Sequence, residues 1–287
     1  MANNAYNGGV IDLDDTLENE LIRLAREIRV IHEEPRSTRV VILAGGRGRR
    51  LEPYTSVLPK PLMPIGNRAI LEIVVNQLAA SGFHKLTFCV GHLSHLIRAV
   101  FESGAGSQVD IEWVKEHEPL GTAGPLRLVP TLDETFLVMN GDLLTTLDYS
   151  ALLEHHRQNE NMLTIASCRR RVRSDYGVIH IGTPDDDQRV VAFEEKPETS
   201  WNVSMGIYAM EPEVLRYIPE SGPFDFPTLA QALLDDGRRA GVFVHRGLWL
   251  DIGRHEDYEA AVELWAHGAR LVAEQVERVK PARSATA

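Results

Sequence analysis

Four basic side chains surround a short glycine-rich loop early in the chain. The stretch ILAGGRGRRLEPYTSVLPKPL covers residues 42–62 and contains Arg47, Arg49, Arg50 and Lys60. It continues the apolar, β-branched segment 39–46, which is typical of a buried strand that ends in a turn. Glycines after such a strand let backbone N–H groups approach phosphate oxygens closely. The stretch therefore predicts a loop that binds phosphate groups.

The glycine spacing differs from that of two well-known phosphate loops. A Walker loop ends in Gly-Lys-Ser/Thr, and the chain contains no such triplet. The dinucleotide fingerprint is G-x-G-x-x-G, but after Gly46 and Gly48 the third position is Leu51. Pro59 and Pro61 fix backbone torsions on both sides of Lys60 and so restrict the position of its ammonium group.

Four later stretches also combine residue types that could do chemistry. They are EPLGTAGPL (118–126), VMNGDLL (138–144), FEEKP (193–197) and GLWLDIGR (247–254). Asp142 and Asp251 each follow a strand-like segment, and carboxylates at strand ends suit Mg²⁺. Taken alone, an aspartate at this position more often caps a helix, and an isolated EEKP is more often a solvated charged run.

The elements that must position these residues alternate between strand-like and helix-like patterns. Strands are predicted at 39–46, 85–91, 110–116, 135–142 and 162–168, and helices at 68–82, 93–104 and 148–160. This alternation predicts a mostly parallel sheet with helices on both faces. Residues 176–210 are denser in strand patterns and predict an antiparallel insertion beside the main sheet. Helices are expected at 226–236 and 254–278, the second with a candidate break at Gly268.

Composition limits the class of protein. The 287 residues are 44% hydrophobic and 25% charged, which suits one large α/β domain. A net charge of −11 argues against binding to nucleic acid or to a membrane surface. The only cysteines, Cys89 and Cys168, indicate a reducing compartment. No apolar run approaches the roughly 18–20 residues of a membrane span, so a soluble cytoplasmic protein is expected.

The order and spacing of the glycine, arginine, proline and lysine residues in this region resemble those of a known family. The stretch LAGGRGRRLEPYTSVLPKPLMPIGNRAI (43–70) resembles the signature of the sugar-1-phosphate nucleotidylyltransferases. EPLGTAGPL resembles their nucleobase-binding loop in its guanylyltransferase form, and VMNGDLL their strand-end aspartate motif. YGVI (176–179), FEEKP and GLWLDIGR resemble the sugar and metal motifs. Within the family, the chain most resembles mannose-1-phosphate guanylyltransferase-like members, and among these the guanylyltransferases that act on unusual sugar phosphates, including amino-sugar, heptose and cyclitol phosphates.

The resemblance implies a fold and a reaction. The fold is Rossmann-like, of the GT-A type: a mixed, mostly parallel sheet with a small antiparallel sugar-binding insertion. It spans residues 38–270, between an N-terminal extension with one helix (1–37) and a helix end and disordered tail (271–287). The reaction joins a nucleoside triphosphate, with GTP favoured, to a sugar or cyclitol 1-phosphate and releases pyrophosphate. A phosphate monoester has its second pKa at about 6, so no general base is needed.

The resemblance also assigns roles to residues. The catalytic residues are Arg50, Lys60, Asp142 and Asp251, of which Asp142 and Asp251 also bind Mg²⁺. The nucleotide-binding residues are Leu43, Ala44, Gly45, Gly46, Gly48, Leu120, Gly121 and Thr122. The sugar-phosphate-binding residues are Gly177, Glu195, Lys196 and Ser204.

One position departs from the family pattern. Relatives often carry Asn-Ala-Gly shortly before the aromatic residue of the Gly-Ile-Tyr strand, whereas the aligned residues in this chain are Ser204, Met205 and Gly206. Serine is shorter and lacks the carbonyl and amide pair, which predicts a pocket for a different hydroxyl pattern. Asn202 lies two residues earlier, on the same side of a regular strand, and is a candidate replacement.

Three other functions were weighed against this one. Asp12, Asp14 and Thr16 form an Asp-x-Asp-x-Thr motif like that of haloacid-dehalogenase-type phosphatases. The glycine-loop strand begins already at residue 39, which leaves no room for such a domain, and the motif suits a helix cap. A glycosyltransferase of similar fold would need an Asp-x-Asp motif after a main-sheet strand. A non-catalytic regulatory subunit would not need both metal carboxylates. A homodimer remains open.

Overall fold

A computed structural model describes residues 37–182 and 189–279 of the chain, and of residues 268–279 only the backbone. The helix and the Asp-x-Asp-x-Thr motif expected in the N-terminal extension, and the tail from residue 280 onward, lie outside the described residues.

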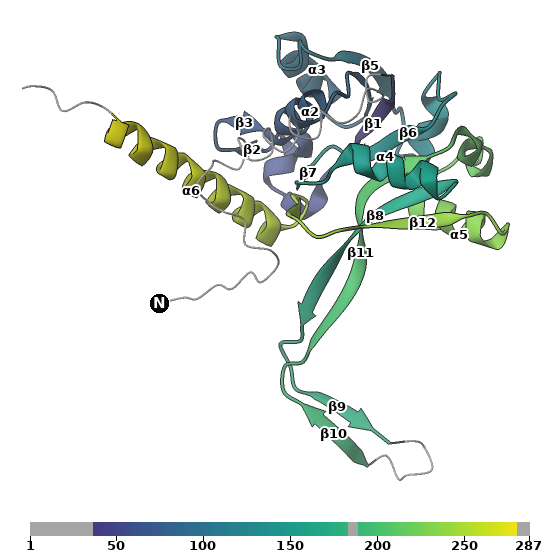
Figure 1. Ribbon diagram of the computed structural model, residues 1–287, viewed down its shortest axis with the longest axis vertical. Helices are drawn as coiled ribbons and strands as arrows, with labels where there is room; N and C mark the ends of the chain where they lie inside the picture. Colours follow the sequence, from purple (N-terminus) through teal and green to yellow (C-terminus); the bar gives the residue numbers. More distant parts are fainter. Residues whose placement is uncertain (1–36, 183–188, 280–287) are drawn as a thin grey trace, which may run out of the picture.

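The body of the molecule is built on a seven-stranded mixed sheet (Figure 1). Its strands, in the order β12-β8-β11-β6-β1-β4-β5, are β12 (Ala240–His245), β8 (Leu163–Arg173), β11 (Glu198–Met210), β6 (Phe136–Asn140), β1 (Arg39–Ala44), β4 (Lys85–Val90) and β5 (Asp110–Lys115). Only β11 runs antiparallel to its neighbours in this sheet. The prediction of a mixed, mostly parallel sheet is therefore confirmed.

Helices and short 3₁₀ turns cover both faces of the sheet. The helices are α2 (Ile70–Ala80), α3 (Ser94–Glu102), α4 (Tyr149–Gln158), α5 (Phe226–Asp235) and α6 (His255–Val279). Val40 and Ile42 of β1 belong to one hydrophobic core with α2, whereas Val41 belongs to a second core with α5. All three valine and isoleucine side chains are fully buried, which explains the continuous apolar run of this strand. Helix α6 is continuous, so the candidate break at Gly268 is wrong. None of the described helices is long and apolar enough to cross a membrane.

A small second ladder joins two distant parts of the chain. Strand β7 (Leu143–Thr145) directly follows β6, and it pairs antiparallel with β13 (Trp249–Asp251). In this ladder Leu143 lies opposite Asp251. Because the loops after β1, β4, β5 and β6 all leave the same edge of the parallel strands, the ladder brings Asp251 to that edge as well.

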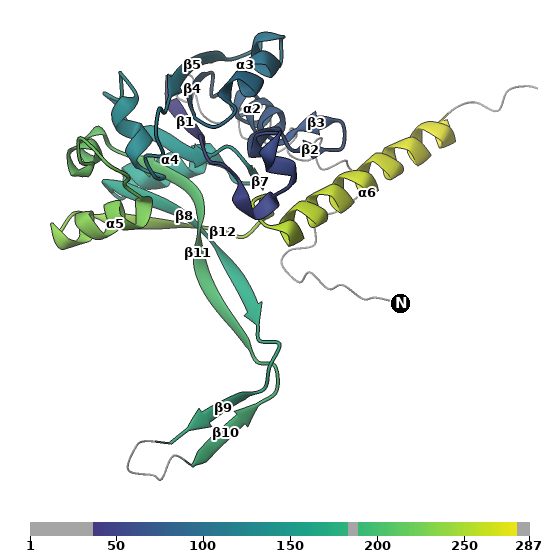
Figure 2. The same ribbon diagram turned by 180° about the vertical axis from the view of Figure 1, so that it is seen from behind.

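The antiparallel insertion extends away from the body. Strands β8 and β11 continue beyond the sheet as a two-stranded ribbon, which ends in a hairpin of β9 (Val178–Ile181) and β10 (Val190–Glu194) (Figures 1 and 2). We call residues 169–181 and 190–202 the arm. The insertion was expected to lie beside the sheet, and its projection from the sheet is a difference from that expectation.

Candidate active site

A cavity of about 730 Å³ lies at the carboxyl edge of the parallel strands. This volume falls within the range of small-molecule sites. Its walls come from the ends of β1, β4, β5 and β6 and from the 3₁₀ turns that follow β1. Every sequence-predicted nucleotide-binding residue lines it: Leu43, Ala44, Gly45, Gly46, Gly48, Leu120, Gly121 and Thr122. The structure therefore brings together two loops that are more than seventy residues apart.

The glycines of the first loop differ in the structural reason for which glycine suits each position. A Cβ atom on Gly45 would collide with the carboxylate of Glu116. Gly48 has φ of +65°, and a Cβ atom there would lie 2.9 Å from the Thr55 methyl group. The Thr55 hydroxyl in turn donates a hydrogen bond of 2.9 Å to the Gly48 carbonyl. Gly46 faces open space, so its backbone is accessible to a ligand.

Basic side chains line the same cavity. Arg47, Arg49 and Arg50 are exposed at its wall, where Arg49 begins the 3₁₀ turn η1 (Arg49–Leu51). Lys60 begins the turn η3 (Lys60–Leu62) between the two prolines and is mostly buried. The positive charge singled out in the sequence thus lines one cavity, an arrangement that suits the binding of phosphate groups.

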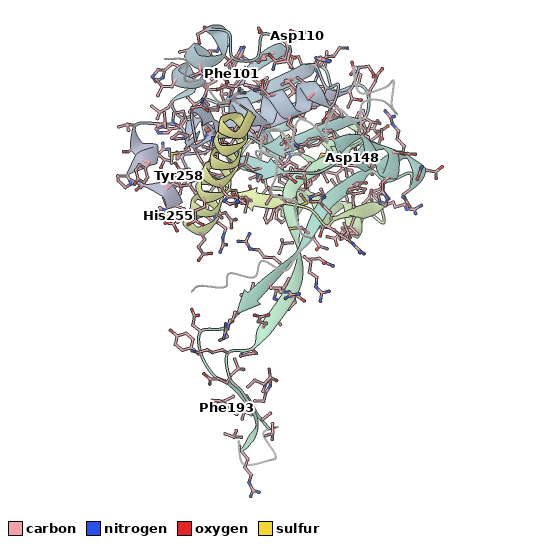
Figure 3. All side chains as sticks on the ribbon, turned by 60° about the vertical axis from the view of Figure 1, so that its left-hand side comes forward. Phe101, Asp110, Asp148, Phe193, His255 and Tyr258 are labelled. Carbon is pink, nitrogen blue, oxygen red and sulfur yellow. The ribbon has the colours of Figure 1, made fainter. Side chains whose placement is uncertain are left out.

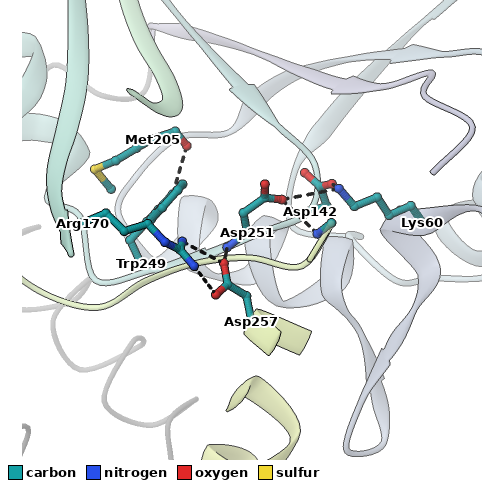
Figure 4. Close-up of polar contacts among 8 residues, drawn as sticks. Lys60, Asp142, Arg170, Met205, Trp249, Asp251 and Asp257 are labelled. Carbon is teal, nitrogen blue, oxygen red and sulfur yellow. Dashed lines mark hydrogen bonds and ion pairs between the residues drawn. The ribbon is translucent and has the colours of Figure 1, made fainter. Parts of the chain in front are cut away.

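The two predicted metal ligands converge on the Lys60 ammonium group (Figure 4). Lys60 forms an ion pair with Asp142, and its Nζ lies 3.5 Å from Oδ1 of Asp251. Burial raises the pKa of Asp142 above its ordinary value, and the charge of Lys60 opposes the rise. Oδ1 of Asp251 also accepts a hydrogen bond of 2.9 Å from the Gly253 amide. Because both carboxylates lie close enough to contact one ammonium group, both could also bind one metal ion.

The donor set fits Mg²⁺ better than a metal that needs an all-protein site. Among the described residues, no group of three or more His, Cys, Asp or Glu side chains is placed to hold a metal ion. Mg²⁺ is commonly held by one or two carboxylates together with substrate phosphates and water. Asp142 and Asp251, beside a phosphate-binding loop, provide that combination.

A network behind Asp251 was not foreseen from the sequence (Figure 4). Arg170, at the root of the arm, binds both carboxylate oxygens of Asp257 at 3.1 and 2.8 Å. Oδ2 of Asp257 accepts a hydrogen bond of 3.2 Å from the Asp251 amide. The guanidinium of Arg170 also lies over the Trp249 ring, 5.6 Å from its centroid. The backbone that carries the second carboxylate is therefore fixed to the root of the arm.

The second nucleotide loop is held by the segment that leads into α5. Backbone N–H groups of Ala123 and Gly124 both donate to the Phe224 carbonyl at 2.9 Å. Asp225 accepts hydrogen bonds from the Thr122 amide and hydroxyl at 2.7 and 3.0 Å. Gly121 has φ of +78°, and a Cβ atom there would lie 2.6 Å from the Phe224 carbonyl oxygen. Asp225 is a positioning residue that sequence reasoning missed, because it lies 103 positions from Thr122.

Replacement of Asp225 should therefore weaken nucleotide binding while leaving the chemistry intact. We expect Asp225→Ala to raise KM for the nucleotide about tenfold, since two hydrogen bonds of roughly 0.5–1.5 kcal/mol each are lost. The rate kcat and KM for the second substrate should change little. Asp225→Asn retains an oxygen acceptor and should restore most of the binding. Steady-state kinetics check this, and an equal loss in both variants would contradict the positioning role.

Glu116 is a second cavity residue that was not singled out. It follows β5, lines the cavity and lies against Gly45. Burial raises the pKa of Glu116 above its ordinary value, and a backbone hydrogen bond from Leu120 opposes the rise. The sequence signal that could have identified Glu116 is its position at a strand end, two residues before EPLGTAGPL.

The residues predicted to bind the sugar phosphate do not line this cavity. Gly177 and the exposed side chains of Glu195 and Lys196 are on the arm, and none of them lines the cavity of its own chain. Ser204 lies at an irregularity of β11, where its hydroxyl donates to the Tyr208 hydroxyl at 3.1 Å and accepts from the Gly206 amide at 3.2 Å. Asn202 lies farther out on the ribbon, opposite Arg169. The different hydroxyl pattern inferred from Ser204 stays a prediction.

Comparisons with known proteins place the chain in a family. The nucleotidyl transferase family model matches residues 39–267. The mannose-1-phosphate guanyltransferase of Aspergillus oryzae is 34% identical over 77% of this chain. The UTP–glucose-1-phosphate uridylyltransferase of Synechocystis sp. is 32% identical over 78% of this chain. The chain spans 62% of the length of both relatives.

Solved structures match the fold over most of the chain. HddC from Yersinia pseudotuberculosis, also solved in complex with GMP-PN, is 25% identical with a TM-score of 0.60. The match covers 79% of this chain and 98% of that one. A putative glucose-1-phosphate thymidylyltransferase from Bacillus anthracis, 24% identical, shares the fold with a TM-score of 0.62 over 80% of this chain and 95% of that one. From the family match and these relatives, we conclude that the chain belongs to the nucleotidyl transferase family, as a member of the sugar-1-phosphate nucleotidylyltransferases.

Proposed function

We propose that this chain transfers a nucleotidyl group from a nucleoside triphosphate to a sugar 1-phosphate. The observation that carries the proposal is that Lys60 and Asp142 line the cavity formed by the glycine loop, while Asp251 contacts the same Lys60 ammonium group. Names of relatives support the same reaction class, since they include guanylyl and uridylyl transfer to hexose 1-phosphates.

The proposed step is an in-line displacement at phosphorus. An oxygen of the sugar phosphate forms a bond to the α-phosphorus, the bond to the β-phosphate bridge breaks, and pyrophosphate leaves with the electron pair. The attacking phosphate is already ionised, so the site needs no base. What limits the rate is the approach of two anions, and positioned positive charge lowers that barrier.

The chain's own residues supply that charge in defined places. Arg50 binds the departing pyrophosphate at the open wall, and the amides of the glycine loop contact the phosphate oxygens. Lys60 can exchange its pairing with the two aspartates for a phosphate oxygen when substrate enters. Mg²⁺, held by Asp142 and Asp251, would neutralise phosphate charge when bound.

GTP is the proposed nucleotide. The loop EPLGTAGPL supports this choice, as do the relatives named for guanylyl transfer. Guanine presents an N1–H and an exocyclic amino group side by side, and a carboxylate can accept hydrogen bonds from both. Glu116, beside the glycine loop, is the carboxylate we propose for this contact. Uracil and thymine have a single ring N–H at that edge and would leave the carboxylate partly unpaired.

A substrate matrix tests the reaction and the base together. Four nucleoside triphosphates are combined with a panel of sugar and cyclitol 1-phosphates, and pyrophosphate release is measured. We expect GTP to be preferred. Glu116→Gln should lower kcat/KM for GTP about 10- to 150-fold, since hydrogen bonds to charged groups contribute roughly 1.5–3 kcal/mol. Activity with UTP should change far less.

Glu134→Gln is the control, because Glu134 is an exposed glutamate that does not line the cavity. It should leave the base preference unchanged. If UTP or dTTP exceeds GTP in the wild type, the base assignment is wrong although the reaction class stands. If no pair of substrates releases pyrophosphate, the proposed function is wrong.

A further inference from the structure

The hairpin at the end of the arm has one apolar and one polar face. Cross-strand pairs Ile179–Phe193 and Ile181–Val190 place four large apolar side chains on one face. All four are more than half exposed. The opposite face carries an ion pair of 3.1 Å between His180 and Glu194. Figure 3 shows Phe193 far from the body of the molecule.

Such a face needs a partner surface. An isolated two-stranded hairpin is at best marginally stable in water. Val172, Tyr176, Val191 and Trp201 add further exposed apolar area to the arm. Large apolar side chains exposed together on one segment often mark an interaction site.

The arm also carries residues that its own cavity lacks. Glu195 and Lys196 follow the hairpin directly, and Lys196 has φ of +48°. A non-glycine residue in this region is uncommon and persists where function or packing requires it. Residue 196 lies eight positions before Ser204, which is roughly 25 Å along an extended ribbon.

The direction of the ribbon is fixed at its root. Backbone pairing continues without interruption from Ser204–Ser167 to Glu198–Arg173. At the root, Arg170 holds the buried carboxylate of Asp257 in the body. In this arrangement Lys196 does not line the cavity of its own chain, so the sugar-phosphate half of that site is incomplete.

Charge favours a second copy as the partner. Arg169, Arg171 and Arg173 alternate along β8 and therefore share one face of the ribbon. Within the part of the chain that the structure describes, no carboxylate forms an ion pair with Arg171 or Arg173. The whole chain carries a net charge of −11, so another copy of the chain has the overall charge that attracts this basic ribbon.

We propose that two copies of the chain form a symmetric dimer. In this dimer the apolar face of each arm packs against the other copy. Lys196 and Glu195 of one chain then complete the sugar-phosphate site in the cavity of the other. The role of Lys196 in this inference rests on the proposed function. The dimer itself rests on the exposed apolar face and on the basic side chains of the arm.

Mixed dimers distinguish action between chains from action within a chain. Chains carrying Lys196→Ala and Asp142→Ala are co-expressed with two different affinity tags, and dimers with both tags are isolated. Each mixed dimer combines one intact cavity with one intact arm from the other chain. We expect about half of the wild-type turnover per dimer, because one of its two symmetric sites is complete.

The matched control places both substitutions in one chain and pairs it with a wild-type chain. Here every site lacks either Lys196 or Asp142 if the arm acts between chains, so almost no turnover is expected. If the arm acts on its own cavity, this dimer keeps half of the activity and the first mixed dimer is inactive. That reversed result, or a failure to isolate any mixed dimer, would overturn the proposal.

Light scattering tests the proposed dimer interface independently of catalytic activity. The wild type should be a dimer, and Ile181→Ser should shift it to a monomer with an unchanged circular dichroism spectrum. Leu234→Ser replaces a similarly exposed aliphatic side chain on α5 and should leave the dimer intact. A monomeric wild type, or a dimer unaffected by Ile181→Ser, counts against the interface. If the wild type shows no turnover with any substrate pair, the proposed function fails and this measurement still judges the interface.

Discussion

Asp142→Asn and Asp251→Asn are each expected to lower kcat by at least about 100- to 1,000-fold, the range measured for removal of one group that stabilises transition-state charge. Asparagine keeps the size of aspartate but removes the negative charge that a divalent cation requires. Asp142 is buried and paired with Lys60, so loss of its charge also leaves the ammonium group with Asp251 alone. Pyrophosphate release at saturating substrates measures the effect, and EDTA should abolish the activity of the wild type.

The matched control for these variants is Asp148→Asn. Asp148 caps α4 through a hydrogen bond of 2.8 Å from the Ala151 amide, and asparagine caps helices equally well. Its variant should keep wild-type turnover. Thermal unfolding should confirm that all three variants are folded. Full wild-type activity in EDTA would show that the two carboxylates do not serve a metal.

Arg50→Ala and Lys196→Ala should affect different kinetic constants. Arg50 lies at the cavity wall beside the glycine loop, so its loss should lower kcat about 100-fold through weaker stabilisation of the departing pyrophosphate. Lys196→Ala should instead raise KM for the sugar phosphate about 10- to 150-fold, since a charged hydrogen bond of roughly 1.5–3 kcal/mol is lost. KM for the nucleotide should change little in the Lys196 variant.

Two further substitutions sharpen this comparison. Arg49→Ala removes a neighbouring exposed arginine on the same 3₁₀ turn, and it should have a much smaller effect than Arg50→Ala. Lys196→Arg keeps the charge and should recover part of the lost affinity for sugar phosphate. Equal effects of the Arg50 and Lys196 variants on both substrates would mean that one of the two residues has been assigned to the wrong group.

The convergence of the glycine loop, its arginines and Lys60 on one cavity could be predicted from the sequence because its signals are local. Strand, glycine turn and basic residues follow one another within residues 39–60. Since the carboxyl ends of parallel strands share one edge, motifs from successive strands had to meet there. Asp142 and Asp251 were placed at that edge by resemblance, and the structure adds the physical reason, the pairing of β7 with β13.

The contacts that hold this site were not predictable in the same way. Arg170 meets Asp257 across 87 positions, and Thr122 meets Asp225 across 103. Neither pair has a local pattern, because each depends on how whole elements pack. The direction of the arm is a similar case: alternation along 176–210 predicts antiparallel strands, but it carries no information on whether they pack against the body.

The pairing of β7 with β13 also sets the order in which the site can be assembled. The glycine loop, Lys60 and Asp142 all leave the ribosome before Asp251, which lies 109 positions after Asp142. At about 5–20 residues per second, the delay is roughly 5–20 s. During that time the emerging chain holds its phosphate-binding groups and only one of the two carboxylates. The pair of carboxylates is therefore completed only after β13 has emerged and has paired with β7, a short strand made long before.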